Sequence, residues 1–424
     1  MPVYRLLYSF LCYLIFPVIL LRLFWRSRQN PSMREHWQQR FGFIKLSQAP
    51  RIWLHAVSVG ETIAAKPLVE ALLANYPSHK LLISNTTATG YQTSKRLFAD
   101  RVEHCYFPYD LNGAVSRFLD RATPELLIIM ETEIWPNLLH QCQQRKLPVL
   151  IANARLSKRS TKGYSRIQSL IKPTLGCVSK IACRSFQDVE NFKRLGATTE
   201  QLEVVGNIKF DIASDILNNS ASELKKQLGI SRKIWVAAST HAGEDEIILN
   251  CYSQLKQSCK DLVLVLVPRH PERFESVFNL CEDSGYITQR RSASQSFTND
   301  CEIILGDSMG EMAYWYASAD IVFVGGSLVE TGGHNPLEAI IYGVPVVSGA
   351  AVFNFNDVYD VLCEAEIAWI TKNEQALTNK LEELLNIREP DRVRLKSRVD
   401  KTLRSNRGAT KKLLQICTDL LGLY

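Results

Sequence analysis

The stretch RIWLHAVSVGETIAAKPLVEALL, Arg51 to Leu73, decides the fold of this chain. Its first part, RIWLHAVSV, is a short apolar run that ends just before Gly60, a residue that lets the backbone turn sharply. Its second part, ETIAAKPLVEALL, has the apolar spacing of a helix. A strand that leads through a tight turn into a helix predicts one unit of a parallel sheet, because parallel strands need a crossover connection that is usually helical.

The same alternation recurs along the chain and predicts an α/β fold. The apolar runs that predict strands are RIWLHAVSV, KLLISNTT, ELLIIME, LPVLIANAR and SKIACRS, then KIWVAAST, DLVLVLVPR, CEIILGDS, ADIVFVGGS and VPVVSG. Two successive doubly wound units with parallel sheets, covered on both faces, are the economical interpretation. A polar stretch between about 206 and 233 is the predicted linker.

Length and these patterns together predict a division into domains. A chain of 424 residues is too long for one ordinary core, so two domains of about 200 residues are expected. We predict an N-terminal membrane anchor at 1–28, an N-terminal domain at 29–215 and a C-terminal domain at 216–424. The basic, helix-like segment 391–424 is expected to pack on the body, and its last helix is a candidate to pack back on the N-terminal domain. A membrane-facing role for its basic side is the alternative.

Charge and cysteine content narrow the classes of partner. The 50 Lys and Arg against 43 Asp and Glu give a net charge of +7, which suits a nucleotide, a phosphorylated lipid or an anionic membrane and is too mild to indicate nucleic acid. The eleven cysteines are scattered without any CxxC pair, so we predict reduced thiols in a cytoplasmic environment and no zinc site. The absence of any Asp-x-Asp disfavours a nucleotide sugar held through a divalent metal.

The N-terminus carries the run LLYSFLCYLIFPVILL, Leu6 to Leu21. As a helix it would reach about 24 Å, which is marginal for crossing a bilayer. Basic residues follow at Arg22, Arg26, Arg28 and Arg34, so the positive-inside rule places the main body in the cytoplasm. We expect a retained anchor and not a cleaved signal peptide, because no small-x-small site precedes the basic cluster. The sequence leaves open whether the anchor spans the membrane or lies in one leaflet.

Carboxylates follow two of the predicted strands in the first half. Ligands of open α/β sheets bind at the carboxyl ends of the strands, so such residues are candidates for a site. Glu61 begins the helix after Gly60, where it serves either chemistry or only the positive end of the helix dipole, and that dipole is expected to keep its pKa low. Glu131 and Glu133 follow ELLIIM, with plain surface exposure as the alternative. Candidate cationic partners for acceptor phosphates in this half are Arg155, Lys158, Arg159 and Lys209.

The second half has the features of a nucleotide site. Arg269 and His270 follow the strand DLVLVLV, where a positive group can meet a phosphate. ILGDSMGEM places Gly306 and Gly310 at a strand-to-helix turn, whose N–H groups can bind an anion. VGGSLVETGGHNPLEA joins Gly325, Gly326, Gly332 and Gly333 to a helix that starts with Asn335 as N-cap, Pro336 at N1 and Glu338 at N3. An ordinary helix cap explains these last three residues as well.

Taken in order, the motifs HAVSVGE, ETEIWPN, NARLS, GNIKFD, STHAGEDE, VPRHPERF, GDSMGEM and VETGGHNPLEA resemble those of the 3-deoxy-D-manno-octulosonic acid (Kdo) transferases of lipid A biosynthesis. The resemblance covers nearly the whole chain. It implies a GT-B glycosyltransferase with two Rossmann-like domains that face a cleft. It further implies transfer of Kdo from CMP-Kdo to a tetra-acylated lipid A precursor, lipid IVA, with inversion, at the cytoplasmic side of the bacterial inner membrane and without metal or other cofactor.

The resemblance also implies roles for single residues. Glu61 corresponds to the general base, and Glu131 and Lys209 would support the transition state. The residues that would hold CMP are Arg269, His270, Gly310, Glu311, Met312, Asn335, Pro336, Leu337 and Glu338. The chemistry agrees, because a sugar hydroxyl has a pKa far above 7 and needs a base as it attacks, while Arg269 and helix N-termini can stabilise the departing phosphate.

Two other functions remain open from the sequence. A nucleotide-sugar epimerase shares a two-domain Rossmann architecture and uses carboxylates, but it has little use for an N-terminal anchor. A membrane-associated nucleotide-binding protein without catalysis explains the glycine turns but leaves Glu61, Glu131 and Glu133 without a purpose.

Overall fold

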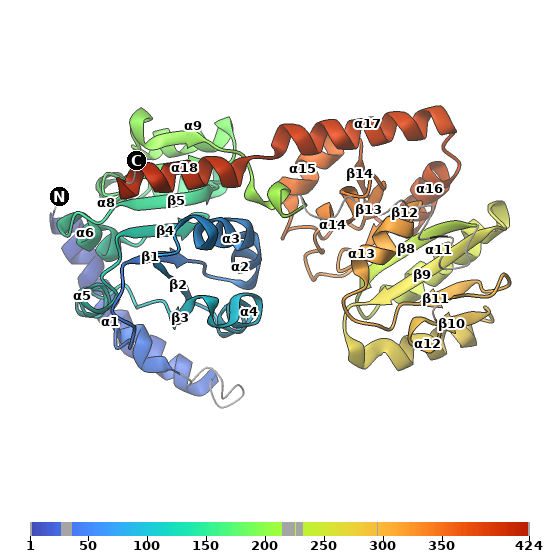
Figure 1. Cartoon of the computed structure of the whole chain (residues 1–424), viewed down its shortest axis with the longest axis horizontal. Coiled ribbons are helices and arrows are strands. Elements are labelled where there is room, and N and C mark those ends of the chain that lie inside the picture. The colour runs from blue at the N-terminus through green and yellow to red at the C-terminus, as the bar shows by residue number, and fades with distance from the viewer. Residues whose placement is uncertain (1, 27–35, 214–224, 226–231, 295, 423–424) are drawn as a thin grey trace. The chain divides into compact units, whose positions relative to one another are not determined.

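The computed structural model describes residues 2–26, 36–213, 225, 232–294 and 296–422. It divides the chain into two compact units, one made of Met1–Ile212 with Asn406–Tyr424 and the other of Ala213–Ser405. Figure 1 shows a sheet with helices on both faces in each unit. The predicted α/β class with two Rossmann-like parallel sheets is therefore confirmed. The predicted boundaries at 28 and 215, Arg28 and Arg34 and most of the predicted linker lie outside the described residues.

The first unit is built on a seven-stranded sheet in the order β3-β2-β1-β4-β5-β6-β7, in which each neighbouring pair of strands is parallel. Its strands are β1 (Arg51–His55), β2 (Lys80–Asn85), β3 (Glu103–Tyr106), β4 (Leu126–Met130), β5 (Val149–Ala154), β6 (Lys180–Cys183) and β7 (Leu202–Val204). Its α-helices are α1 (Pro2–Arg26), α2 (Val59–Ala64), α3 (Lys66–Asn75), α4 (Ala88–Phe98), α5 (Asn112–Ala122), α6 (Pro136–Gln144), α7 (Lys158–Ser165), α8 (Gln168–Leu175), α9 (Phe186–Leu195) and α18 (Ala409–Leu421). The single helix expected after Gly60 is divided at Ala65 into α2 and α3, because Pro67 starts a new helix.

The second unit repeats the plan with the strand order β10-β11-β9-β8-β12-β13-β14, again parallel throughout. Its strands are β8 (Lys233–Thr240), β9 (Leu262–Pro268), β10 (Thr288–Arg290), β11 (Ile303–Leu305), β12 (Ile321–Val324), β13 (Val346–Ser348) and β14 (Ala368–Ile370). Its α-helices are α11 (Asp245–Ser258), α12 (Phe274–Asp283), α13 (Met312–Ser318), α14 (Leu337–Ile340), α15 (Asn356–Glu364), α16 (Glu374–Leu385) and α17 (Glu389–Asn406).

The apolar cores lie against the sheets. In the first unit, one cluster contains Trp53 and Phe118 and a second contains Leu54 and Met130, because successive residues of a strand point to opposite faces. The second cluster includes Leu413 of α18, so the last helix belongs to the core of the first unit. The helix-like segment predicted at 391–424 forms two helices, α17 and α18, separated at Gly408, whose φ of 99° few other residues adopt.

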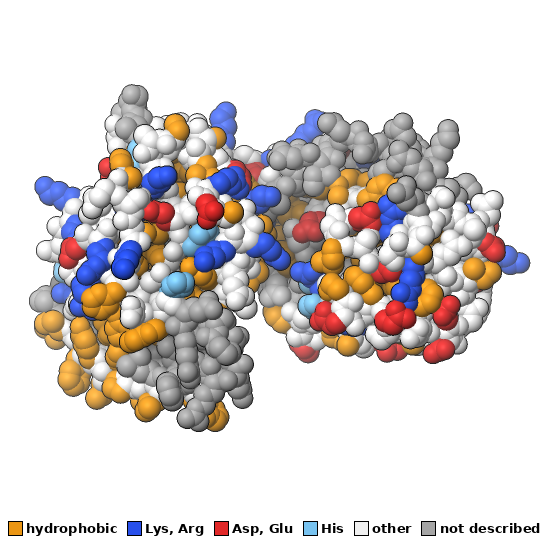
Figure 2. Space-filling model, turned by 60° about the horizontal axis from the view of Figure 1, so that its bottom comes forward, with side chains coloured by type: hydrophobic (Ala, Val, Ile, Leu, Met, Phe, Trp, Pro, Cys, Tyr) orange, Lys and Arg blue, Asp and Glu red, His pale blue; other side chains and the backbone are white. Residues whose placement is uncertain are grey.

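Helix α1 presents its polar stripe to the first unit. The Ser9 hydroxyl and the Arg5 guanidinium donate to Oδ1 of Asn137 at 2.8 and 3.3 Å, and the Tyr8 hydroxyl donates to Asp110 at 3.0 Å. The opposite side is exposed and apolar, with Val3, Tyr4, Leu6, Leu7, Phe10, Leu11, Tyr13, Leu14, Ile15, Val18, Leu21 and Trp25. Figure 2 shows hydrophobic side chains gathered over this helix. None of the helices in the described part of the chain combines the length and apolarity that crossing a bilayer requires.

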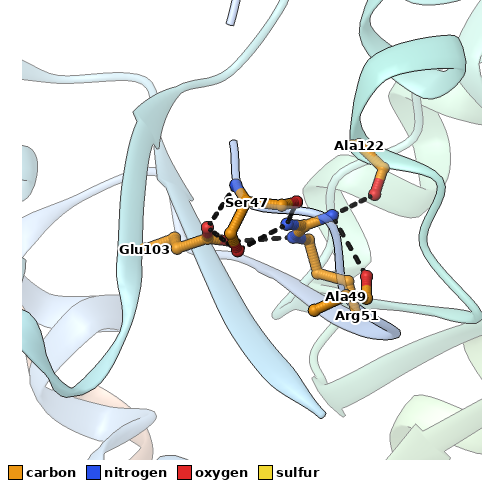
Figure 3. A network of polar contacts seen from close by, with 5 residues as sticks. All are labelled: Ser47, Ala49, Arg51, Glu103 and Ala122. Carbon is orange, nitrogen blue, oxygen red and sulfur yellow. Dashed lines mark hydrogen bonds and ion pairs between the residues drawn. The ribbon is translucent and has the colours of Figure 1, made fainter. Parts of the chain in front are cut away.

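A buried arginine ties the amino ends of two strands together (Figure 3). Arg51, only 1% exposed, donates to Glu103 of β3 at 2.7 Å, to the carbonyl of Ala122 at 2.8 Å and to the carbonyl of Ser47 at 2.6 Å. Because the guanidinium has lost its water, each of these acceptors is needed to compensate for its burial.

Replacement Arg51→Met is expected to lower the free energy of unfolding by about 3 kcal/mol, since it removes the donor to Oε2 of Glu103 and to two carbonyls, while Oε1 of Glu103 keeps the N–H and hydroxyl of Ser47. Chemical denaturation of the purified protein measures this change. Arg101→Met is the matched control, because Arg101 pairs with Glu70 at 2.7 Å while both side chains are well exposed, and its loss should change stability by less than about 1 kcal/mol. Equal effects of the two substitutions would contradict this account.

Candidate functional site

In each sheet the strand order reverses at one place, and polar turns follow the strands there. In the first sheet the strand order reverses between the neighbours β1 and β4, and in the second between β8 and β12. The crevice at the carboxyl ends of two such strands is where open α/β sheets bind ligands. Glu61 and Glu131 follow β1 and β4, while His241 and Gly325 follow β8 and β12. The predicted residues Glu61, Glu131 and Gly325 therefore lie at the switch points of their own units, whereas the predicted residues Arg269 and His270 follow β9.

Glu61 lies in the first turn of α2 with both carboxylate oxygens engaged. The N–H of Val57 donates to Oε2 at 2.8 Å, and the Ser58 hydroxyl donates to Oε1 at 2.9 Å. Ser58 is the N-cap of the helix. Asn85, at the end of β2, donates to the carbonyl of Ala56 at 2.7 Å and to the hydroxyl of Thr62 at 2.9 Å. The position of Glu61 is thereby fixed from both sides, and Asn85 is a supporting residue that the sequence did not indicate.

The pKa of Glu61 differs from the expectation. Burial, followed by the nearby charges of Glu131 and Glu133, raises the pKa to about 7, although the Val57 N–H and the Ser58 hydroxyl work in the opposite direction. The predicted lowering by the helix dipole is therefore wrong, because desolvation outweighs the helix start. A base with a pKa near 7 is still ionised in a useful fraction at neutral pH and holds a proton more firmly than an ordinary carboxylate.

Glu131 and Glu133 lie beside Glu61 and complete a carboxylate cluster. Burial and the charge of Glu131 raise the pKa of Glu133 to about 7. The ammonium of Lys209 lies 3.9 Å from Glu131 Oε1, and its side chain is only 10% exposed. The structure thus brings Glu61, Glu131 and Lys209 into one region, as the resemblance implies. The alternative of plain surface exposure is wrong for Glu133, since burial is the main cause of its raised pKa.

Backbone strain marks the same strand ends. Glu131 and Asn153 have φ values of 58° and 55°, and Ser239 in the second unit has 57°. Left-handed conformations of such residues are unfavourable and tend to occur where the surroundings impose them, often at functional sites. Asn153 is fully buried, and its Oδ1 accepts the N–H of Ile208 at 3.1 Å, so it fixes the segment that carries Lys209.

The other predicted cations of the first unit are less closely tied to this cluster. The N–H of Arg155 donates to the Thr132 hydroxyl at 3.2 Å, so the backbone of Arg155 is held beside the turn that bears Glu131 and Glu133. Arg159 is exposed on α7, and Lys158 begins that helix. The structure therefore places the backbone of Arg155 next to the carboxylate turn, while Arg159 lies exposed on α7.

The raised pKa values predict how activity depends on pH. The role of base that the resemblance implies for Glu61 requires an ionised carboxylate, so activity is expected to rise as the pH rises through the pKa of about 7. Below about pH 6, kcat/KM should fall about tenfold per pH unit, with apparent pKa values that belong to the cluster as a whole. Initial rates measured over a range of pH test this decrease in kcat/KM. A rate that stays constant down to about pH 5 would contradict a base of raised pKa.

Arg269 and His270 lie directly after β9, as predicted, and His270 precedes the 3₁₀ turn Pro271–Arg273. The N–H of Arg269 donates to the carbonyl of Thr240 at 3.0 Å, which joins the ends of β8 and β9. The ring of His270 makes an edge-to-face contact with His241, with centroids 5.3 Å apart. The charge of Arg269 acts on His334 and on Glu338, so these residues share one region.

The turn Gly310–Met312 is bound to the protein itself. Glu311 precedes α13 and pairs with Arg291 at 2.9 Å, and the Ser308 hydroxyl also donates to Glu311. Gly310 has a φ of 87° and open space around it. GDSMG, Gly306 to Gly310, has the GxSxG spacing of a hydrolase nucleophile elbow, but the partner that receives the Ser308 proton is a carboxylate in an ion pair. The Glu311 carboxylate therefore has a structural role here.

The segment Asn335–Glu338 starts α14 one residue later than predicted. The helix is Leu337–Ile340 with Pro336 as its N-cap, and Asn335 Oδ1 accepts the N–H of Leu337 at 3.2 Å. Asn335 therefore still caps the helix start through its side chain. Glu338 is exposed, and Asn335 lies 3.5 Å from its carboxylate.

Glu244 is the residue of this half that the sequence reasoning missed. It is fully buried, and its two oxygens accept four backbone N–H groups. Gly326 and His241 donate to Oε2 at 2.7 and 2.8 Å, while Ser327 and Leu328 donate to Oε1 at 3.0 and 2.9 Å. One carboxylate thus fixes the glycine turn after β12 to the turn after β8. The signal was present in THAGE, which mirrors SVGE as a strand-end turn that closes on a glutamate.

Comparison with known proteins agrees with this geometry. The family model described as 3-deoxy-D-manno-octulosonic-acid transferase (kdotransferase) matches residues 35–212, and the model described as glycosyl transferases group 1 matches residues 283–402. The two matches fall on the two units. With the parallel sheets, they support the GT-B glycosyltransferase fold that the resemblance implies.

Full-length relatives extend the match. The chain is 40% identical to the 3-deoxy-D-manno-octulosonic acid transferase of Haemophilus influenzae over 99% of both proteins. It is 32% identical to the enzyme of the same name from Bordetella pertussis, over 88% of each chain. A solved structure of a putative UDP-N-acetylglucosamine 2-epimerase from Listeria monocytogenes matches with a TM-score of 0.55 at 16% identity, over 88% of this chain and 96% of that one. This last likeness shows the shared fold alone.

Proposed function

Because this chain belongs to the Kdo transferase family, and is a glycosyltransferase that transfers Kdo in lipopolysaccharide synthesis, we propose that it takes Kdo from CMP-Kdo and transfers it to lipid IVA with inversion at the anomeric carbon. The observation that carries the proposal is Glu61: a carboxylate held by two hydrogen bonds at a topological switch point, with its pKa raised to about 7.

In the proposed reaction an acceptor hydroxyl attacks the anomeric carbon of Kdo. The hydroxyl proton passes to Glu61, the new glycosidic bond forms, and the bond from the anomeric carbon to the phosphate oxygen breaks with its electron pair on CMP. A base contributes about 10²–10⁴-fold to such a step. Lys209, 3.9 Å from Glu131, places a cation in the carboxylate region that can stabilise the negatively charged substrates during transfer.

The second unit supplies the proposed donor site. CMP leaves as a phosphate monoester, so its negative charge increases as the bond breaks. The region proposed to bind CMP consists of Arg269, the glycine turns at Gly310 and Gly326 and the start of α14. Glu244 holds the turn at Gly326 in place. The proposal includes no metal ion.

The experiment that tests the proposal measures CMP release from CMP-Kdo by the purified protein, with and without lipid IVA. We expect release that depends on lipid IVA. Turnover of a nucleotide sugar without any lipid acceptor would instead support the epimerase, which shares the fold. Binding of CMP without turnover on lipid acceptors would support a binding protein.

We also propose that the protein attaches to the cytoplasmic face of the bacterial inner membrane through α1. The support is the orientation of the two faces of this helix. Its polar residues Arg5, Tyr8 and Ser9 face the protein, and its large apolar side chains are exposed. Exposure of so many apolar side chains on one helix is unfavourable in water and favourable at the surface of a bilayer. Because the polar stripe is bonded to Asn137 and Asp110, the proposed arrangement is a helix that lies in one leaflet.

Substitution Leu14→Glu is expected to weaken binding to vesicles of anionic phospholipid by about tenfold or more, because it places a charge in the apolar face. Flotation of the purified protein with such vesicles measures this. Val393→Glu is the matched control, since Val393 of α17 is 61% exposed and Leu14 is 63% exposed. Unchanged flotation of Leu14→Glu would contradict the membrane proposal. So would a wild-type protein that forms dimers without vesicles, if Leu14→Glu abolishes these dimers.

A further inference from the structure

Two histidines meet at the switch point of the second sheet. His241 follows β8 and His334 follows the glycine turn after β12, and their Nε2 atoms are 2.9 Å apart. The ring planes are nearly parallel, with an interplanar angle of 14° and centroids 5.1 Å apart. Gly326 makes room for them, because a Cβ at this position would lie 3.3 Å from His334 and 3.4 Å from His241. The pair is therefore built into the turn that Glu244 fixes.

A contact of 2.9 Å between two imidazole nitrogens requires one proton between them. One ring donates its Nε2–H and the other accepts with its lone pair, so both rings are neutral in the simplest state. One further proton can enter at Nδ1 of the donating ring, which makes the shared hydrogen bond charge-assisted. A second added proton would place two N–H groups against each other. The pair therefore acts as one site that can take up a single proton.

The charges around the pair oppose protonation in the free protein. Burial, followed by Arg269, His241 and His270, lowers the pKa of His334 to about 4. Burial is also the main cause that lowers the pKa of His241, and His270, Arg273 and Arg269 add to it. The one carboxylate that acts on His241 in the other direction is Glu244, whose oxygens already accept four backbone N–H groups. An anion placed among these groups would favour the protonated pair.

We propose that His241 and His334 form a proton-accepting pair at the donor phosphate, which takes up one proton when the phosphate monoester of CMP binds. The inference rests on the proposed function, because CMP is the product of that reaction. During transfer the bond to the anomeric carbon breaks, its electron pair stays on the phosphate oxygen, and the pair takes up one proton from the solvent, so that its imidazolium offsets the added negative charge. The proton of the acceptor hydroxyl goes separately to Glu61, so atoms and charge balance.

Calorimetry of CMP binding in buffers of different ionisation enthalpy tests this directly. At about pH 7 free CMP is mostly dianionic, since the second pKa of a phosphate ester is about 6. We expect the wild-type protein to take up close to one proton per bound CMP. In His241→Asn and His334→Asn, uptake should fall near zero and CMP should bind about 10–100-fold more weakly. His334→Gln provides a second variant at that position if His334→Asn does not fold.

The outcomes separate the two claims. His140→Asn, a substitution on α6 of the first unit, should leave both uptake and affinity unchanged. CMP binding to the wild-type protein without proton uptake would show that the histidine pair does not accept a proton. Proton uptake that persists in both pair variants and disappears in His270→Asn would show the same. Either result leaves the assignment of the donor site intact. Absence of CMP binding to the wild-type protein overturns both.

Discussion

Substitution Glu61→Gln is expected to lower kcat for Kdo transfer by about 10²–10⁴-fold while the protein stays folded. The amide cannot accept the proton of the attacking hydroxyl. The shape of the side chain is kept, and one of the two hydrogen bonds, from the Val57 N–H or the Ser58 hydroxyl, can still be made to the amide oxygen. Initial rates at saturating CMP-Kdo and lipid IVA, together with thermal unfolding, measure the effect.

Glu203→Gln is the matched control for this prediction. Glu203 is an exposed carboxylate on β7 of the same unit, so its replacement should leave kcat within about twofold of the wild type. The affinity of Glu61→Gln for CMP should also be unchanged, because the proposed donor residues belong to the other unit. Near-normal turnover of Glu61→Gln would remove Glu61 from the role of base.

The second large effect is expected for Glu244→Gln, which should weaken CMP binding by about 100-fold or more. Glu244 accepts two N–H groups at each oxygen. In glutamine one oxygen becomes an NH₂ group, which faces two N–H donors and can accept neither. The glycine turn that follows β12 then loses its attachment to the turn after β8. Calorimetric titration with CMP measures the loss.

Glu330→Gln tests whether this effect is specific to the buried carboxylate. Glu330 is exposed in the same glycine-rich segment, so its replacement should change CMP affinity by less than about threefold. Thermal unfolding of both variants shows whether the second unit still folds. Full CMP affinity in a folded Glu244→Gln variant would show that the carboxylate does not organise the donor site.

The inner strands of both sheets could be predicted from the sequence, and the outer ones could not. All ten predicted strands are present, whereas β3, β7, β10 and β14 were missed, and these four are the edge strands. Inner strands of a parallel sheet are buried on both faces and therefore carry continuous apolar runs. Edge strands such as β10, TQR, are short and partly exposed, so their composition does not distinguish them from loops.

The position of the site followed from the sequence, but its electrostatics did not. Glu61, Glu131, Arg269 and His270 lie at strand ends because the alternation of strand and helix fixes where each strand stops. The pKa of Glu61 depends on how much water its neighbours exclude, which no local pattern records. Glu244 binds N–H groups more than 80 residues further along the chain, so its role appears only when the two turns are brought together.

The most direct test of the central claim is the mass of the lipid product. Purified protein is incubated with CMP-Kdo and lipid IVA, in parallel with the Glu61→Gln variant, and the lipid is analysed by mass spectrometry. The account predicts that the wild-type protein adds the mass of one or more whole Kdo residues to lipid IVA, and that the variant leaves nearly all of the acceptor unmodified. An unchanged acceptor mass with the wild-type protein, or an equal gain with both proteins, would contradict it.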